Sequence, residues 1–193
     1  MEIATKQDNL GMKILSVLHR DHINMSKLLT LIERNIEQIK QGHSADLKLM
    51  AEAIEYIGHY ADLYHHPLED VLYDYFKDKS AELTLLINRC EKEHQDLKVC
   101  TEQVLSPISV SLLDGMLPMA KIIENLEAFL EQEKQHINFE EGQIFPKIEA
   151  LANAQDWEKL AKESWLKTDA MFQKFDSNHY AELYADLEEA IAS

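Results

Sequence analysis

The sequence has few of the residues that interrupt regular secondary structure. Only 5 of its 193 residues are glycine and 4 are proline, while 46% are hydrophobic. This composition is typical of a folded, helix-rich protein and unlike that of a disordered one. No uninterrupted apolar run of about 18 residues occurs, and no basic segment followed by an apolar one opens the chain. We therefore expect a cytoplasmic protein with no membrane partner.

Cysteine is also scarce. The two cysteines, Cys90 and Cys100, fall ten residues apart on one predicted helix, which separates them by roughly 15 Å along its axis. That distance is too great for the two to form a disulfide with each other. The sequence therefore does not encode the disulfide framework of a small secreted protein.

Basic residues are outnumbered by acidic ones. The chain has 19 Lys and Arg against 35 Asp and Glu, which gives a formal net charge of -16. Because nucleic-acid phosphates would be repelled by this surface, we expect no nucleic-acid partner. A protein partner and the oligomeric state stay open.

Apolar residues recur at helical spacing in four long segments that follow a short polar arm at residues 1–9. We expect helices over about 10–41, 46–76, 80–105 and 118–146. Turn and cap residues separate them, namely Gly42, Ser44 or Asp46, Ser80, Ser106-Pro107 and Asp114-Gly115. Pro67 and Pro146 each remove a backbone hydrogen bond, so we expect a kink or a break at these prolines.

These segments predict an all-α fold. It is an antiparallel up-down-up-down four-helix bundle over about residues 10–150, with short extra C-terminal helices in 151–193. No linker or shift in composition divides the chain, so we expect residues 1–193 to form a single domain.

Two motifs place a histidine and a glutamate four residues apart. They are His65-x-x-x-Glu69, in the second predicted helix, and His136-x-x-x-Glu140, in the fourth. Residues at i and i+4 share one face of a helix, so each pair can point at the same spot. Two such pairs predict a metal site inside the bundle, with further ligands from the other two helices.

One histidine from each predicted helix falls at the same level of the bundle. The four are His22, His65, His94 and His136. In an up-down bundle, residues at one level on adjacent helices are equidistant from the turn that joins them. The position halfway between each consecutive pair falls on a turn, namely beside Gly42, at Lys79-Ser80 and at Gly115. The four imidazoles can therefore lie in one layer.

Four imidazoles and two carboxylates suit first-row metals. Iron is the first candidate, with manganese and zinc as substitutes. Glu69 and Glu140 each have two oxygens, so each can bridge two ions. Six protein groups around two ions leave positions for dioxygen, peroxide or nitric oxide.

This pattern resembles the hemerythrin-like HHE cation-binding family. The segments His-His-Pro-Leu-Glu-Asp-Val-Leu-Tyr and His-x-x-x-Glu-Glu-x-x-Ile-Phe-Pro are similar to the most typical segments of that family, and the resemblance covers about residues 12–150. It implies a non-haem di-iron centre, whose two iron ions an oxo or hydroxo group can bridge. The ligands that it implies are His22, His65, Glu69, His94, His136 and Glu140.

Two positions differ from the oxygen-carrying hemerythrins. Those proteins have His-x-x-x-His on the third helix, whereas Cys90 stands four residues before His94. Their last carboxylate is an aspartate five residues after its histidine, whereas here Glu140 comes at four and Glu141 at five. The four-histidine set looks more like the di-iron proteins linked to nitrosative stress and iron–sulfur cluster repair. Those proteins also carry a cysteine-bearing N-terminal region, and residues 1–10 contain no cysteine.

Several residues near the motifs have alternative roles. His19, three residues before His22, is a rival ligand on the first helix. His66, Asp70 and Glu141 are further candidates for binding the metal. Tyr73 and Cys90 are more readily explained as core residues.

A rival metal scheme is a ferritin-like centre. Glu91-x-x-His94 and Glu133-x-x-His136 match the Glu-x-x-His motif of those proteins. The motifs fall on the third and fourth helices here, whereas ferritin-like bundles carry them on the second and fourth, so we disfavour this scheme.

Three functions fit these features. The first is a di-iron protein that binds dioxygen or nitric oxide for sensing, stress protection or iron handling. The second is a di-iron enzyme that removes peroxide or nitric oxide. The third is a helical protein-interaction module.

Overall fold

The computed structural model describes residues 4–44, 46–112, 118–160, 181–186 and 189. Every element in these ranges is helical, which confirms the predicted all-α class. No helix in this part of the chain is both long enough and apolar enough to cross a lipid bilayer.

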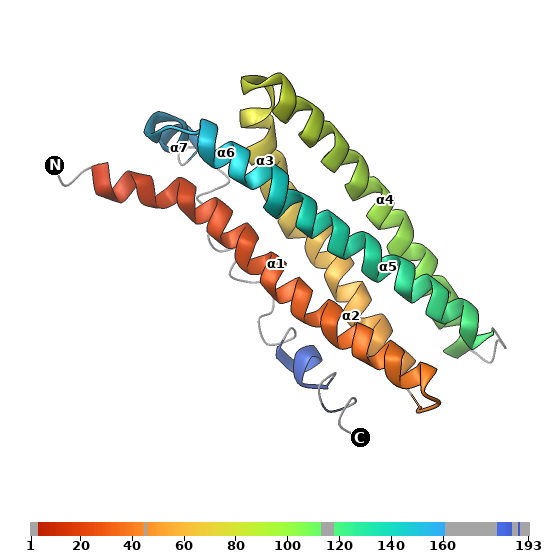
Figure 1. Cartoon of the computed structure of the whole chain (residues 1–193). Helices are drawn as coiled ribbons and strands as arrows, with labels where there is room; N and C mark the ends of the chain where they lie inside the picture. Colours follow the sequence, from red (N-terminus) through yellow and green to blue (C-terminus); the bar gives the residue numbers. More distant parts are fainter. Residues whose placement is uncertain (1–3, 45, 113–117, 161–180, 187–188, 190–193) are drawn as a thin grey trace.

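Long helices lie alongside one another and form a helical bundle (Figure 1). The α-helices are α1 (Ala4–Lys40), α2 (Leu47–Tyr60), α3 (His66–Phe76), α4 (Ala81–Leu112), α5 (Met119–Phe139), α6 (Phe145–Leu151) and α7 (Ala154–Leu160). Two π-helical turns, η1 (Ala61–His65) and η3 (Glu140–Ile144), join α2 to α3 and α5 to α6, and a 3₁₀ turn, η2 (Lys77–Lys79), precedes α4. Helix α4 packs on α2 and α5, while α1 packs on α5, α2 and α7.

Two of the predicted turns have the cap chemistry that the sequence indicated. Gly42 has φ 89° after the end of α1, a conformation that glycine adopts without strain. Leu49 N–H donates to Asp46 Oδ1 over 3.0 Å at the start of α2, and Leu83 N–H donates to Ser80 Oγ over 3.0 Å at the start of α4. Helix α1 begins at Ala4, so the prediction of a polar arm was wrong for residues 4–9, while residues 1–3 lie outside the described residues.

A widened helical turn precedes each proline where a kink or a break was expected. Pro67 lies two residues after η1, and Pro146 lies two residues after η3. The N–H of His66 bonds to the carbonyl five residues back, at Ala61, and the second turn closes in the same way. The π turns accommodate the prolines and leave the chain helical on both sides.

A third proline does not end its helix. The connection between the third and fourth long helices was predicted to begin at Ser106-Pro107, but α4 continues through Pro107 to Leu112. Pro107 cannot donate to the carbonyl of Gln103, four residues back. The side-chain Nδ2 of Asn125, on α5, donates to that carbonyl over 3.3 Å instead. Ile108 is fully buried directly after the proline, so packing keeps this turn helical.

The C-terminal part lies against the bundle where it is described. Helix α7 packs on α1, and residues 181–186 are helical with Leu183 buried. The rest of the predicted C-terminal helices lies outside the described residues.

The buried apolar side chains form two separate clusters. One contains residues such as Met25, Ile57, Leu130 and Ile137, and the other contains residues such as Leu18, Leu68, Cys90 and Phe139. Between Leu18 and Met25 on α1 lies His22, and each of the other three predicted ligand histidines falls between members of the two clusters. A polar layer therefore separates two apolar parts of the core.

Candidate metal centre

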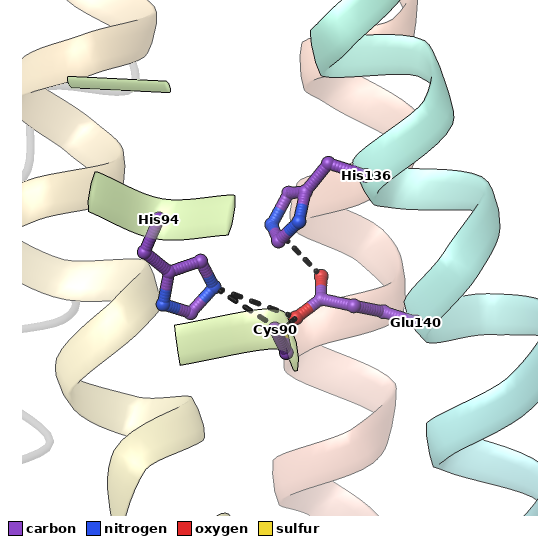
Figure 2. Close-up of side chains that lie close together, drawn as sticks. All are labelled: Cys90, His94, His136 and Glu140. Carbon is purple, nitrogen blue, oxygen red and sulfur yellow. Dashed lines mark hydrogen bonds and ion pairs between the residues drawn. The ribbon is translucent and has the colours of Figure 1, made fainter. Parts of the chain in front are cut away.

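All six side chains predicted as ligands meet in this polar layer. They come from every long segment of the bundle, namely His22 from α1, His65 from η1, Glu69 from α3, His94 from α4, His136 from α5 and Glu140 from η3. Each is at most 7% exposed. Figure 2 shows His136 and Glu140, from the continuous helix formed by α5 and η3, pointing toward His94 and Cys90 of α4.

The four imidazoles form two pairs. Nε2 of His22 and Nε2 of His65 are 2.9 Å apart, and their ring centroids are 4.6 Å apart. The rings of His94 and His136 meet nearly edge to face, with centroids 4.8 Å apart and an interplanar angle of 79°. The prediction that the four histidines lie at one level agrees with these contacts.

Glu69 lies between the two pairs. Its Oε1 is 3.2 Å from Nε2 of His65, and its Oε2 is 3.4 Å from Nε2 of His94. The i, i+4 spacing of His65 and Glu69 brings these groups together as the sequence indicated.

Glu140 also spans the layer. Its Oε2 is 3.2 Å from Nε2 of His22 and 3.4 Å from Nε2 of His136. Its Oε1 is 3.6 Å from Nε2 of His94. Each of the two carboxylates therefore faces imidazoles of both pairs.

Several buried polar atoms in this layer have no hydrogen bond to any described residue. They are Nδ1 of His65, both carboxylate oxygens of Glu69, Nε2 of His136 and Oε2 of Glu140. A buried polar atom left unpaired costs about 1–3 kcal/mol, and more if it is charged. Cations bound in the layer would take up the lone pairs of the Glu69, His136 and Glu140 atoms, whereas Nδ1 of His65 faces Asp21 on the other side of its ring. The residues present therefore fit a metal centre of nitrogen and oxygen donors, and such a donor set suits iron, manganese or zinc.

Carboxylates also lie behind three of the four imidazoles, on the side away from the layer. The Nδ1–carboxylate distances are 2.8 Å from His22 to Glu141, 3.6 Å from His65 to Asp21 and 3.3 Å from His136 to Glu93. A carboxylate at Nδ1 orients the ring so that Nε2 faces the ion, and it makes the ring a stronger donor. The same arrangement recurs on three different helices.

The charges within the layer compensate one another when no metal is bound. Burial lowers the pKa of His65, but the facing Glu69 carboxylate outweighs it and the pKa rises to about 10. Burial also lowers the pKa of His136, and Glu140 outweighs it so that the pKa rises to about 9. Burial raises the pKa of Glu140, yet the imidazole of His136 holds it well below its usual range. Protons then occupy the place that cations would take.

The alternative ligands lie at the edge of this layer. His19 is exposed, and its Nδ1 is 3.0 Å from Glu141 Oε1, which also accepts from His22. His66 stacks on the ring of His94 at a centroid distance of 3.8 Å. Asp70 is exposed. The structure therefore places Glu141 behind His22, on the side away from the layer.

Two side chains beside the centre were expected to be ordinary core residues. The hydroxyl of Tyr73 donates to Glu140 Oε1 over 2.7 Å, and Sγ of Cys90 donates to the same oxygen over 2.9 Å. Sγ of Cys90 is also 3.4 Å from Nε2 of His94. The i, i+4 spacing of Cys90 and His94 was the available signal for the cysteine.

The ferritin-like scheme does not agree with these contacts. Glu91 lies on the surface side of α4, where it forms an ion pair of 2.6 Å with Lys77. Glu133 is buried, but among the described residues it is not part of any cluster of three or more donors close enough to share an ion. The polar layer is thus made by the two His-x-x-x-Glu motifs.

Comparison with known protein families gives a match over most of the chain. The sequence profile described as the hemerythrin HHE cation binding domain matches residues 13–148. This range includes all six side chains of the layer and ends within α6.

The chain belongs to the hemerythrin HHE cation-binding family. Searches of curated proteins and of solved structures found no match. The resemblance seen in the two sequence motifs is therefore confirmed. The buried donor groups and the family match together indicate a metal-binding, hemerythrin-like protein. Helix α7 of this hemerythrin-like chain lies beyond the matched range.

We expect the metal-free protein to lose stability as the pH rises from about 7 to about 9. His65 and His136 have raised folded-state pKa values of about 10 and about 9. Protonation of these histidines therefore stabilises the fold fully below the ordinary histidine pKa of 6.5. This stabilisation is lost as the pH rises toward the folded-state pKa values. Denaturant unfolding of chelator-treated protein should show a decrease on the order of a few kcal/mol over this range. The variant His65→Gln should weaken the dependence, and an unfolding free energy that stays level or rises with pH would contradict the charge arrangement.

Proposed function

We propose that this chain is a non-haem di-iron protein that binds dioxygen or nitric oxide, for sensing, stress protection or iron handling. The observation that carries the proposal is the position of the two glutamates. Glu69 lies 3.2 Å from His65 and 3.4 Å from His94, and Glu140 lies 3.2 Å from His22 and 3.4 Å from His136. Two carboxylates that each face both imidazole pairs are suited to bridging two ions.

The proposed ligand set is the one indicated by the sequence. His22 and His65 would hold one ion, His94 and His136 would hold the other, and Glu69 and Glu140 would bridge them. The close approach of these donors and the unpaired atoms among them support this division. Bound iron would supply redox chemistry and a free coordination position for a small ligand.

The protein's own side chains would tune that centre. Tyr73 and Cys90 donate hydrogen bonds to Glu140 Oε1, which lowers the electron density on that carboxylate. Glu141, Asp21 and Glu93 would orient the imidazoles from behind.

We also propose that the bundle is antiparallel, with α1, the α2–α3 segment, α4 and α5 running up, down, up and down. One histidine from each segment reaches the same layer, and short connections join α1 to α2 and α3 to α4. We propose a single domain with a cytoplasmic location. Both cysteines are free and buried, which fits a reducing compartment.

Replacing a proposed ligand should remove metal. We expect His65→Ala and His136→Ala to lower the iron content of protein purified without added metal, because each loses a donor from a buried site and affinity falls by at least about tenfold. His43→Ala is the matched control, since His43 is exposed after the end of α1. Elemental analysis checks the result. Full iron content in both ligand variants would contradict the assignment.

The small ligand is tested by anaerobic loading with ferrous iron followed by addition of dioxygen or nitric oxide. We expect a new visible absorption band that is stable and that reverses on degassing. Continuous consumption of peroxide or nitric oxide would instead make the protein a di-iron enzyme. Failure to take up any metal would leave only a helical interaction module.

A further inference from the structure

A cavity beside the proposed centre has a lining suited to cations. It has a volume of about 290 Å³ and lies between α2, η1 and α4, with its inner part reaching α5. The exposed part of its lining includes Glu55, Asp62 and Glu102, and its inner part includes the buried Glu133 and the half-buried His66. We refer to it as the α2–α4 cavity.

Glu133 is a buried carboxylate whose position calls for an explanation. It is 6% exposed and lines the α2–α4 cavity. Within the described ranges, no residue donates a hydrogen bond to its carboxylate or forms an ion pair with it. Burial raises its pKa to about 7. A carboxylate in such a position is favoured by a proton or by a cation that enters the cavity.

The inner end of this cavity adjoins the proposed centre through His66. The ring of His66 stacks on His94 with centroids 3.8 Å apart and lies edge-on to His136 at 6.1 Å. Donor atoms of His66, Glu69 and His94 all lie within 4.8 Å of one another. An ion held near Glu133 and His66 could therefore pass from His66 directly to Glu69, a proposed bridging ligand.

The charge of the lining favours the approach of cations. Four carboxylates line the cavity, at Glu55, Asp62, Glu102 and Glu133, against one basic side chain, Lys98. Nζ of Lys98 is paired with Asp62 over 3.0 Å, so it neutralises only one of them. A cleft lined by one sign of charge concentrates ions of the other sign.

Two other cavities reach the centre, one of them lined by His136 itself, but in each the carboxylate next to a proposed ligand already accepts hydrogen bonds. The cavity between α4 and α5 contains Glu93, which accepts from Arg89 over 2.7 Å and from His136 over 3.3 Å. The cavity beside α6 contains Glu141, which accepts from both His19 and His22. Glu133 is unlike these two because its carboxylate forms no hydrogen bond or ion pair with the part of the chain that the structure describes.

We propose that ferrous iron reaches the centre through the α2–α4 cavity, with Glu133 and His66 forming a transient site on the way. This inference rests on the proposed di-iron function. Carboxylate and imidazole donors suit a ferrous ion that is held briefly and then released to a richer ligand set.

The test is the rate at which metal-free full-length protein takes up ferrous iron under anaerobic conditions. Uptake is followed as the fraction of iron that a fast coloured chelator no longer captures, and the final iron content is measured separately. Glu133→Gln keeps the size of the side chain and removes its charge. We expect uptake to slow by about tenfold while the final iron content stays unchanged.

A second pair of variants tests the path itself. Thr101→Trp places a large ring in the α2–α4 cavity, and Gln103→Trp places the same ring in the α4–α5 cavity, two residues further along α4. We expect Thr101→Trp to slow uptake and Gln103→Trp to load at the rate of the unchanged protein. Far-UV circular dichroism of both variants checks that they fold.

The outcomes separate this inference from the proposed function. Uptake at the unchanged rate in Glu133→Gln would overturn the route and leave the di-iron assignment intact. Slow uptake in Gln103→Trp alone would assign the route to the α4–α5 cavity. A lower final iron content in Glu133→Gln would make Glu133 a permanent ligand, which also overturns the transient site. No iron uptake by the unchanged protein would overturn both proposals.

Discussion

The structure depends on the burial of two glutamates, Glu69 and Glu140, in the polar layer between two apolar parts of the core. Neither side chain is exposed, and both lie between two pairs of imidazoles. Uncompensated carboxylates in such a place would destabilise the fold by several kcal/mol each. Positive charge must therefore be present in the layer, either as protons on the histidines or as bound cations. The raised pKa values of His65 and His136 allow the first, and the unpaired donor atoms of the layer allow the second.

The backbone brings these groups together with locally unusual turns. His65 is the last residue of one π turn and Glu140 is the first residue of the other, and a proline follows each turn. A π turn shifts the face that the following helix presents, which lets a histidine or a glutamate aim into the layer while the apolar residues beyond it stay in the core. The two apolar clusters on either side of the layer fix the positions of the helices. The ligands are thereby held on rigid elements rather than on loops.

Much of the fold and of the proposed site followed from local patterns in the sequence. The i, i+4 spacing places His65 beside Glu69 and His136 beside Glu140. The caps at Asp46 and Ser80 mark the starts of α2 and α4. These features depend on neighbours close in the chain, where helix geometry alone decides the outcome.

Features that depend on partners far along the chain were not predictable in this way. Pro107 stays within its helix because Ile108 packs in the core and Asn125, on the next helix, donates to the carbonyl that the proline leaves free. Tyr73 and Cys90 were expected to be packing residues, since the spacing of Cys90 and His94 indicates only that these two are neighbours and not that Tyr73 and Cys90 both meet Glu140. The proposed role of Glu133 in iron entry depends on the α2–α4 cavity, and the spacing of residues along the sequence does not reveal a cavity.

The central claim is that two metal ions lie within this layer, and an anomalous difference map at the iron absorption edge tests it most directly. Crystals of the iron-loaded protein should show one peak next to Nε2 of His22 and Nε2 of His65. A second peak should lie next to Nε2 of His94 and Nε2 of His136, with Glu69 and Glu140 between the two. A single peak, or peaks that do not lie among these six side chains, would contradict the account.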